Sequence, residues 1–137
     1  MANWLLKEEP DHYNYADLER DGTTVWDGVD NNLARQNLRK IQKGDRLWIY
    51  HTGKEKAVVG EAVAVSGPLP DPASDDPKAV VVKVKAVRRL PSPVSLARIK
   101  ADPDLASWEL ARLPRLSVVP VSEGQWRRVE ELSRGTA

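Results

Sequence analysis

Residues 26–53 decide how we interpret this chain. Residues 26–32 read WDGVDNN and residues 48–53 read WIYHTG, with an amphipathic segment between them. The first motif is a polar turn leading into a helix, and the second is an apolar strand that ends in polar or titratable groups. We expect the two motifs to close an aromatic-walled pocket with hydrogen-bonding groups at its floor. Such a pocket fits a flat, polar ring, and a nucleobase is the ligand we favour.

The segments around these motifs predict a sheet with short helices. Asn31 or Asn32 can cap a helix whose apolar stripe holds Leu33, Ala34, Asn37, Leu38 and Ile41, and Gly44 ends it. A strand over 45–51 and a strand over 57–66 follow, and Gly60 predicts a bulge or a close backbone approach. The remaining expected elements are strands at 4–6, 23–26, 79–87 and 116–121, and helices capped by Asn14, Ser95, Asp104 and the Ser122–Gln125 capping box.

Short connections after Tyr50 favour antiparallel pairing, and Pro91 and Pro93 are expected to end the strand that begins at Ala79. The predicted fold class is therefore α+β. We expect a small β-barrel of about five to six mostly antiparallel strands, with short helices packed outside. At 137 residues, the chain is expected to form a single domain over 1–137.

Composition excludes several classes of function. The formal net charge is +1, and there is no cysteine, so neither a thiol nucleophile nor a zinc–thiolate site is possible. Two histidines far apart in sequence make a metal site improbable, and nothing indicates a cofactor. No apolar run approaches the roughly 18 residues of a membrane span, and the N-terminus lacks signal-peptide character. We expect a cytoplasmic monomer.

Basic side chains concentrate in segments 31–56 and 83–100, whereas most of the charged side chains in residues 1–30 are acidic. The two basic segments could form one face that meets nucleic-acid phosphates, with Arg35, Lys40, Lys54 and Lys83 as the candidates. They could equally be two solvated faces that never meet.

Residues proposed for the pocket could instead have a purely structural role. Trp26 could stack on a base or belong to the core. Asn31 could read a paired donor and acceptor on a base edge, or only cap a helix. Along the strand end, Tyr50 and Thr52 should point one way and His51 the other. His51 could also be an ordinary packed histidine.

Lys7, Glu8 and Glu9 form a second polar cluster at a strand end. A lysine beside carboxylates can serve acid–base chemistry, although such runs are usually solvated surface. No nucleophile elbow, phosphate-binding glycine loop or metal-spaced acidic set accompanies the cluster. We therefore assign no catalytic residue and do not expect an enzyme.

Three ordered motifs give the chain a specific resemblance. WLLKEEP at 4–10, WDGVDN at 26–31 and YHT at 50–52 resemble the EVE domain family, and the match extends to residues 80–91 and 116–121. This family includes the thymocyte nuclear proteins and belongs to the PUA-like superfamily. The resemblance implies a PUA-like β-barrel with a pocket for a modified base flipped out of DNA or RNA. Carried over by motif, the pocket would use Trp26, Asn31, Tyr50, His51 and Thr52, with Lys7, Glu8 and Asp30 beside it.

Two departures from the family pattern bear on specificity. The family usually has serine at the position of Glu8, and arginine-asparagine-tyrosine where this chain has Asp30-Asn31-Asn32. A carboxylate weakens the attraction for phosphate but can accept a hydrogen bond from an amino group, as on cytosine or adenine.

Three functions remain open from the sequence. We favour a non-enzymatic module that recognises a modified, flipped nucleobase in DNA or RNA. The alternative is a small PUA-like amidohydrolase acting on acylated pyrimidine nucleosides, with Lys7 and a neighbouring carboxylate in its chemistry. A third possibility is an adaptor domain whose pocket is vestigial.

Overall fold

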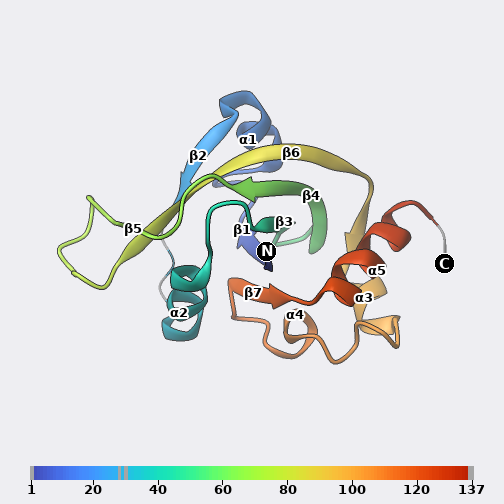
Figure 1. Ribbon diagram of the computed structural model, residues 1–137. Helices are drawn as coiled ribbons and strands as arrows, with labels where there is room; N and C mark the ends of the chain where they lie inside the picture. The colour runs from blue at the N-terminus through green and yellow to red at the C-terminus, as the bar shows by residue number, and fades with distance from the viewer. Residues whose placement is uncertain (1, 28, 30, 136–137) are drawn as a thin grey trace.

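The computed structural model of the protein describes residues 2–27, 29 and 31–135. Within these residues, strands and short helices alternate along the chain (Figure 1). The strands are β1 (Asn3–Glu8), β2 (Thr23–Trp26), β3 (Arg46–His51), β4 (Ala57–Ala64), β5 (Leu69–Pro70), β6 (Val80–Ser95) and β7 (Val118–Val121). The helices are α1 (Tyr15–Asp21), α2 (Asn32–Lys40), α3 (Leu96–Ala101), α4 (Glu109–Arg112) and α5 (Glu123–Ser133).

Six of the strands follow one another in the order β2-β6-β4-β3-β1-β7, and β5 pairs with β6. β1 and β3 pair in parallel, whereas the other ladders of the described residues are antiparallel. The predicted α+β class with mostly antiparallel strands is confirmed, with seven strands in place of five to six. The parallel pair is the feature that brings the ends of β1 and β3 to the same edge.

The closed barrel is not found in the described part of the chain. β2 and β7 end the strand order, and no ladder joins them. α2 packs against both β7 and β6, so it covers the apolar surface between these two strands. A helix in that position buries apolar side chains of the sheet that the closing strands of a barrel would otherwise bury.

β6 corrects a second expectation, because it continues through Pro91 and Pro93 to Ser95. It pairs with β4 at Gly60↔Arg89 and again at Val58↔Val94, so residues 90–93 have no ladder partner on β4. Proline removes a donor, which is harmless where no ladder bond is made. The two prolines therefore occupy a wide bulge in one long, arched strand (Figure 1).

α2 has a narrower buried stripe than the sequence suggested. Ala34, Asn37 and Leu38 are buried, and so is the C-cap residue Ile41, which gives the i, i+3, i+4, i+7 spacing of a helix face. Leu33 lies on the flank of this stripe and is 45% exposed, so its predicted place in the core is wrong. Asn37 joins helix to sheet, because its Nδ2 donates to the Val118 carbonyl oxygen at 2.8 Å.

α1 packs on the sheet where Gly60 lacks a side chain. A Cβ at Gly60 would lie 2.5 Å from the Tyr15 ring, and the ladders on both sides of Gly60 shift register nearby. The predicted bulge and close approach are both confirmed. The Tyr15 hydroxyl lies 2.6 Å from the Glu61 carbonyl oxygen and 2.8 Å from that of Arg88, so the ring bridges β4 and β6.

The C-terminal third closes the core from the other side. Trp126 of α5 stacks on Trp48 of β3 with ring centroids 3.8 Å apart, so the helix is packed on the sheet. The predicted Asp104 cap is wrong, because the turn after Asp102 delays α4 until Glu109 and its N-cap is Trp108. Of the helices described, none is long and apolar enough to cross a membrane.

Candidate functional site

The parallel ladder assembles part of the predicted site. Its register places Lys7 opposite Tyr50 and Glu8 opposite His51. Just beyond the last pair, the Thr52 N–H donates to the Glu8 carbonyl oxygen at 3.0 Å. Two segments more than forty residues apart in sequence therefore end together, each with polar side chains. The backbone at this edge is fixed by ladder hydrogen bonds, so its side chains are presented from rigid elements.

A cavity of about 230 Å³ lies on one side of this edge, next to Trp26. Glu8 contributes to it from β1, and the other described lining residues come from the segment before α1, from β2 and from the residue directly after β2. The lining residues are Glu8, His12, Tyr13, Thr24, Val25, Trp26 and Asp27. The cavity brings Trp26 and Glu8 together as predicted, but Tyr50, His51 and Thr52 are not in its lining.

Trp26 is 5% exposed, so most of its ring surface is covered in this conformation. Its indole Nε1 has no hydrogen-bond partner among the described residues. Stacking of a base on this ring stays a prediction.

Glu8 presents a carboxyl group with one oxygen in use. Its Oε1 accepts from the Glu9 backbone N–H at 2.9 Å, and Oε2 accepts no hydrogen bond within the described chain. Burial raises the pKa of Glu8, the charges of Asp27 and Glu9 raise it further, and the Glu9 N–H and His12 oppose them. A donor arriving in the cavity would therefore relieve an unfavourable charge.

Lys7 lies on the opposite side, because consecutive residues of a strand point to opposite faces. Its Nζ donates to the Pro114 carbonyl oxygen at 3.0 Å and lies 5.6 Å from the centroid of the Tyr50 ring. Burial lowers the pKa of Lys7 and raises that of Tyr50 to about 12. No carboxylate of the described residues forms an ion pair with Lys7, so its ammonium rests on a carbonyl oxygen and an aromatic face.

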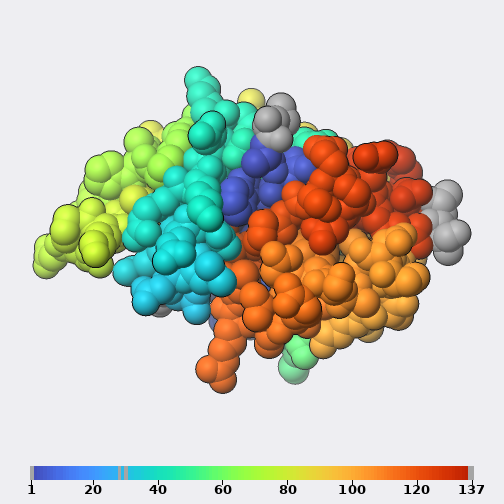
Figure 2. All heavy atoms as spheres, turned by 60° about the horizontal axis from the view of Figure 1, so that its bottom comes forward, coloured from blue at the N-terminus to red at the C-terminus, as the bar shows by residue number. Residues whose placement is uncertain are grey.

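Asn31 belongs to this second side. Its Oδ1 accepts from the Ala34 N–H at 3.0 Å, so its role as the α2 cap is confirmed. It also borders an apolar groove of about 330 Å³ between the start of α2 and segment 113–116, where Leu33 and Leu113 are exposed. Figure 2 shows these two parts of the chain meeting on one face. Asp30, also predicted for the site, lies outside the described residues.

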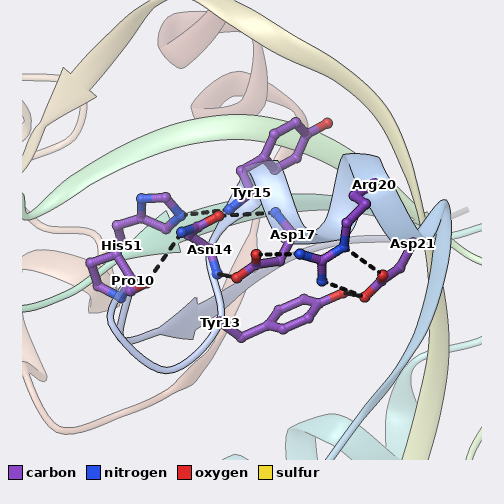
Figure 3. Close-up of polar contacts among 8 residues, drawn as sticks. All are labelled: Pro10, Tyr13, Asn14, Tyr15, Asp17, Arg20, Asp21 and His51. Carbon is purple, nitrogen blue, oxygen red and sulfur yellow. Dashed lines mark hydrogen bonds and ion pairs between the residues drawn. The ribbon is translucent and has the colours of Figure 1, made fainter.

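His51 is committed to the fold (Figure 3). Its Nε2 accepts from the Tyr15 backbone N–H at 3.1 Å, and its Nδ1 lies 2.7 Å from Glu55 Oε1. Because Nε2 is the acceptor, the ring proton must sit on Nδ1 and point at Glu55. Tyr15 opens α1, and its N–H has no partner within the helix. His51 therefore completes the cap that Asn14 and Asp17 begin.

Thr52 has the opposite character. Its Oγ1 is buried and forms no hydrogen bond to any described residue. A buried hydroxyl without a partner is costly, but this one is enclosed by protein, so no ligand reaches it in this conformation. Thr52 adjoins Glu8 through its backbone, which keeps this hydroxyl at the edge where β1 and β3 end.

The four predicted phosphate contacts differ in availability. The Arg35 guanidinium is engaged, since Nε donates to the Val29 carbonyl oxygen at 2.8 Å and a terminal nitrogen lies 3.4 Å from Asp76. Lys40, Lys54 and Lys83 are exposed, and their side chains form no ion pair within the described residues. Lys54 stands nearest the site, because it borders a hollow with Glu9 and Pro10.

The sequence did not indicate His12, Tyr13, Thr24 or Asp27 as lining residues. For His12 and Tyr13, the sequence feature that could have indicated a place in the lining is their position directly after the strand that Pro10 ends. Chain that leaves a strand end and returns as a helix must cross that end. Thr24 could have been inferred from β2, where it lies two residues before Trp26.

Together the fold and the cavity define a class: a small α+β domain with an acidic, aromatic-lined recess where two parallel strands end. The chain belongs to the EVE domain family, whose profile matches residues 2–132, so the resemblance seen in the sequence is confirmed. Thymocyte nuclear protein 1 of Homo sapiens is 28% identical over 159 residues, which cover 91% of this chain and 71% of that protein. The Mus musculus protein is 30% identical over 157 residues, with 90% and 70% covered.

Solved structures agree on the fold. Rpa0253 from Rhodopseudomonas palustris superimposes with a TM-score of 0.93 at 34% identity, covering 100% of this chain and 96% of that one. The human THYN1 protein, solved in complex with DNA containing 5-methylcytosine, gives a TM-score of 0.89 at 28% identity over 97% of this chain and 98% of that one. An ASCH protein from Zymomonas mobilis shares the fold alone, with a TM-score of 0.59 at 14% identity and 96% and 95% covered.

Proposed function

We propose that this protein is a non-enzymatic module that binds DNA carrying a modified base. The base would be turned out of the helix and held at the edge where β1 and β3 end. The observation that carries this proposal is the cavity shared by Trp26 and Glu8, which offers an indole and an open carboxylate oxygen side by side. The human relative solved with 5-methylcytosine DNA supports the same kind of ligand.

The two sides of the edge would act together on an extruded nucleotide. Trp26 and Tyr13 would contact the base in the cavity, while Lys7 and Asn31 would meet the sugar and phosphate that follow it. Extrusion of a base costs a few kcal/mol, which contacts of this kind must offset.

The experiment is a binding titration with a duplex that contains one 5-methylcytosine and with its unmethylated copy. The expected result is tighter binding of the methylated duplex by wild type, and loss of that preference in Trp26→Ala with some non-specific affinity left. Trp26→Phe keeps an aromatic ring and should retain part of the preference. Val87→Ala, at an exposed position of β6, is the control.

Folding of each variant is checked by thermal unfolding, because Trp26 also contributes to the core. Equal affinity of wild type for both duplexes, repeated with single-stranded DNA and with RNA carrying the same base, would refute the proposal. A methylation preference seen only with RNA would move the ligand from DNA to RNA.

An amidohydrolase acting on acylated pyrimidine nucleosides is the second candidate. It is favoured by Lys7, whose pKa burial lowers and which has no carboxylate partner among the described residues. It is weakened by the strand geometry, since Lys7 and Glu8 point to opposite faces and cannot share one substrate atom as nucleophile and proton carrier. Turnover of a free acylated nucleoside by wild type, and not by Lys7→Arg, would establish this activity.

A further inference from the structure

The cavity beside Trp26 carries more carboxylates than basic groups, and His12 brings the one imidazole among its described lining residues. Glu8 and Asp27 bring two carboxylates, and no lysine or arginine is among the described residues that line it. Like charges repel strongly where water is partly excluded. Phosphate oxygens and the carbonyl edge of a base are therefore unfavourable occupants, whereas N–H donors are favourable ones.

Glu8 is the acceptor best placed to meet such a donor. Its backbone is held in the parallel ladder opposite His51 and by the Thr52 N–H, so the carboxyl group is presented from a fixed strand end. Oε1 is already occupied by the Glu9 N–H, which leaves Oε2 for a ligand. Burial and the neighbouring Asp27 charge raise the pKa of Glu8, so a donated hydrogen bond would compensate the ionised group.

We propose that Glu8 makes this site selective for bases with an exocyclic amino group, such as cytosine derivatives, over keto bases such as thymine. The inference rests on the proposed function and adds what part of the base is read. At one position of the ring, cytosine carries the N4 amino donor and thymine the O4 acceptor. A carboxylate accepts a hydrogen bond from the first and repels the second. Glu8 is thus a specificity-determining residue.

The competing explanation is that Glu8 only supports the turn through its contact with the Glu9 N–H. Glu8→Gln separates the two roles, because the amide keeps an oxygen for that contact and removes the charge. The amide can also donate, so it tolerates a carbonyl group that the carboxylate rejects. Glu9→Gln, one residue along and exposed, is the matched control for the change in net charge.

The test uses four otherwise identical oligonucleotides with cytosine, 5-methylcytosine, uracil or thymine at one position. Each base stands opposite an abasic site, so that no base pair has to be broken. Comparing the bases with and without the methyl group tests the proposed function. Comparing the amino bases with the keto bases at constant methylation tests the role of Glu8.

Wild type is expected to bind 5-methylcytosine about tenfold more tightly than thymine, the size of one well-formed base contact. Glu8→Gln should reduce this ratio to near one, and Glu9→Gln should leave it unchanged. Equal affinity of wild type for 5-methylcytosine and thymine would overturn the inference, and so would a ratio that survives in folded Glu8→Gln. Either result can occur with the methyl preference intact, so the proposed function is judged separately.

Discussion

His51 shows how a side chain within a motif shared by a family can serve the fold. Both ring nitrogens are engaged, one by the amide that opens α1 and the other by Glu55. The His51 side chain is 8% exposed, which leaves little of it for a ligand. His51 therefore joins the end of β3 to the start of α1, although it lies beside the candidate site.

The first prediction concerns this histidine. His51→Ala should lower the free energy of unfolding by about 1–3 kcal/mol, because the Tyr15 N–H would be buried without an acceptor. Urea unfolding followed by tryptophan fluorescence measures this change. His12→Ala is the control, since no hydrogen bond of the His12 side chain is found in the described structure, and it should change stability by less than about 0.5 kcal/mol. Similar losses in both variants would contradict the capping role.

At the scale of elements, the contact of α1 with the sheet depends on the missing side chain of Gly60. Gly60→Ala places a methyl group 2.5 Å from the Tyr15 ring, so α1 or β4 must move. We expect a loss of about 1–3 kcal/mol, typical of overpacking in a well-packed core. Gly124→Ala in α5 is the matched control, because its nearest neighbour would be 3.9 Å away. The control should be neutral or stabilising by up to about 1 kcal/mol. If both variants were equally stable, the close approach would be wrong.

The elements also show what the sequence can and cannot predict. The caps at Asn14, Ser95 and Ser122 were predicted and are found, because a capping side chain bonds an amide only three residues away. The close approach of another group to Gly60 was also predictable, because a glycine inside a strand pattern usually indicates a bulge or a close contact. The continuation of β6 through Pro91 and Pro93 was not predictable, because it depends on a bulge against β4.

In the candidate site too, local features were predictable and features that depend on distant segments were not. Its motifs were visible in the sequence, but their distribution over two faces follows from the parallel pairing of β1 with β3, a contact between distant segments. His12 and Tyr13 join the cavity only because the chain after β1 crosses the strand end on its way to α1. The parallel pairing has no signal in a local pattern, and the only signal for His12 and Tyr13 is their place directly after a strand.

At the scale of the whole molecule, positive and negative charges nearly balance, but only some of the basic side chains form internal ion pairs. Arg88 pairs with Glu61 and Glu130, and Arg89 pairs with Glu19, so part of the basic segment 83–100 is neutralised internally. In the proposed function, attraction to the DNA backbone would then come from exposed basic side chains that are not engaged internally, such as Lys40.

The corresponding prediction is measured as a salt dependence. Lys40→Ala should weaken binding to methylated and unmethylated DNA by the same factor. It should also reduce the slope of log affinity against log salt by about 0.9, the loss of one phosphate contact. Arg20→Ala is the control, because its charge is already paired with Asp17 and Asp21. A change in base preference without a change in slope would show that Lys40 does not meet a phosphate.

β1 lies between β3 and β7, so the first strand of the sheet has the last strand as a neighbour. During synthesis, a nascent chain would hold an unpaired β1 edge until residues 118–121 leave the ribosome. The domain can therefore complete its sheet only after β7 has been synthesised. A chain stopped before β7 would expose an apolar strand edge to chaperones or to other copies of itself.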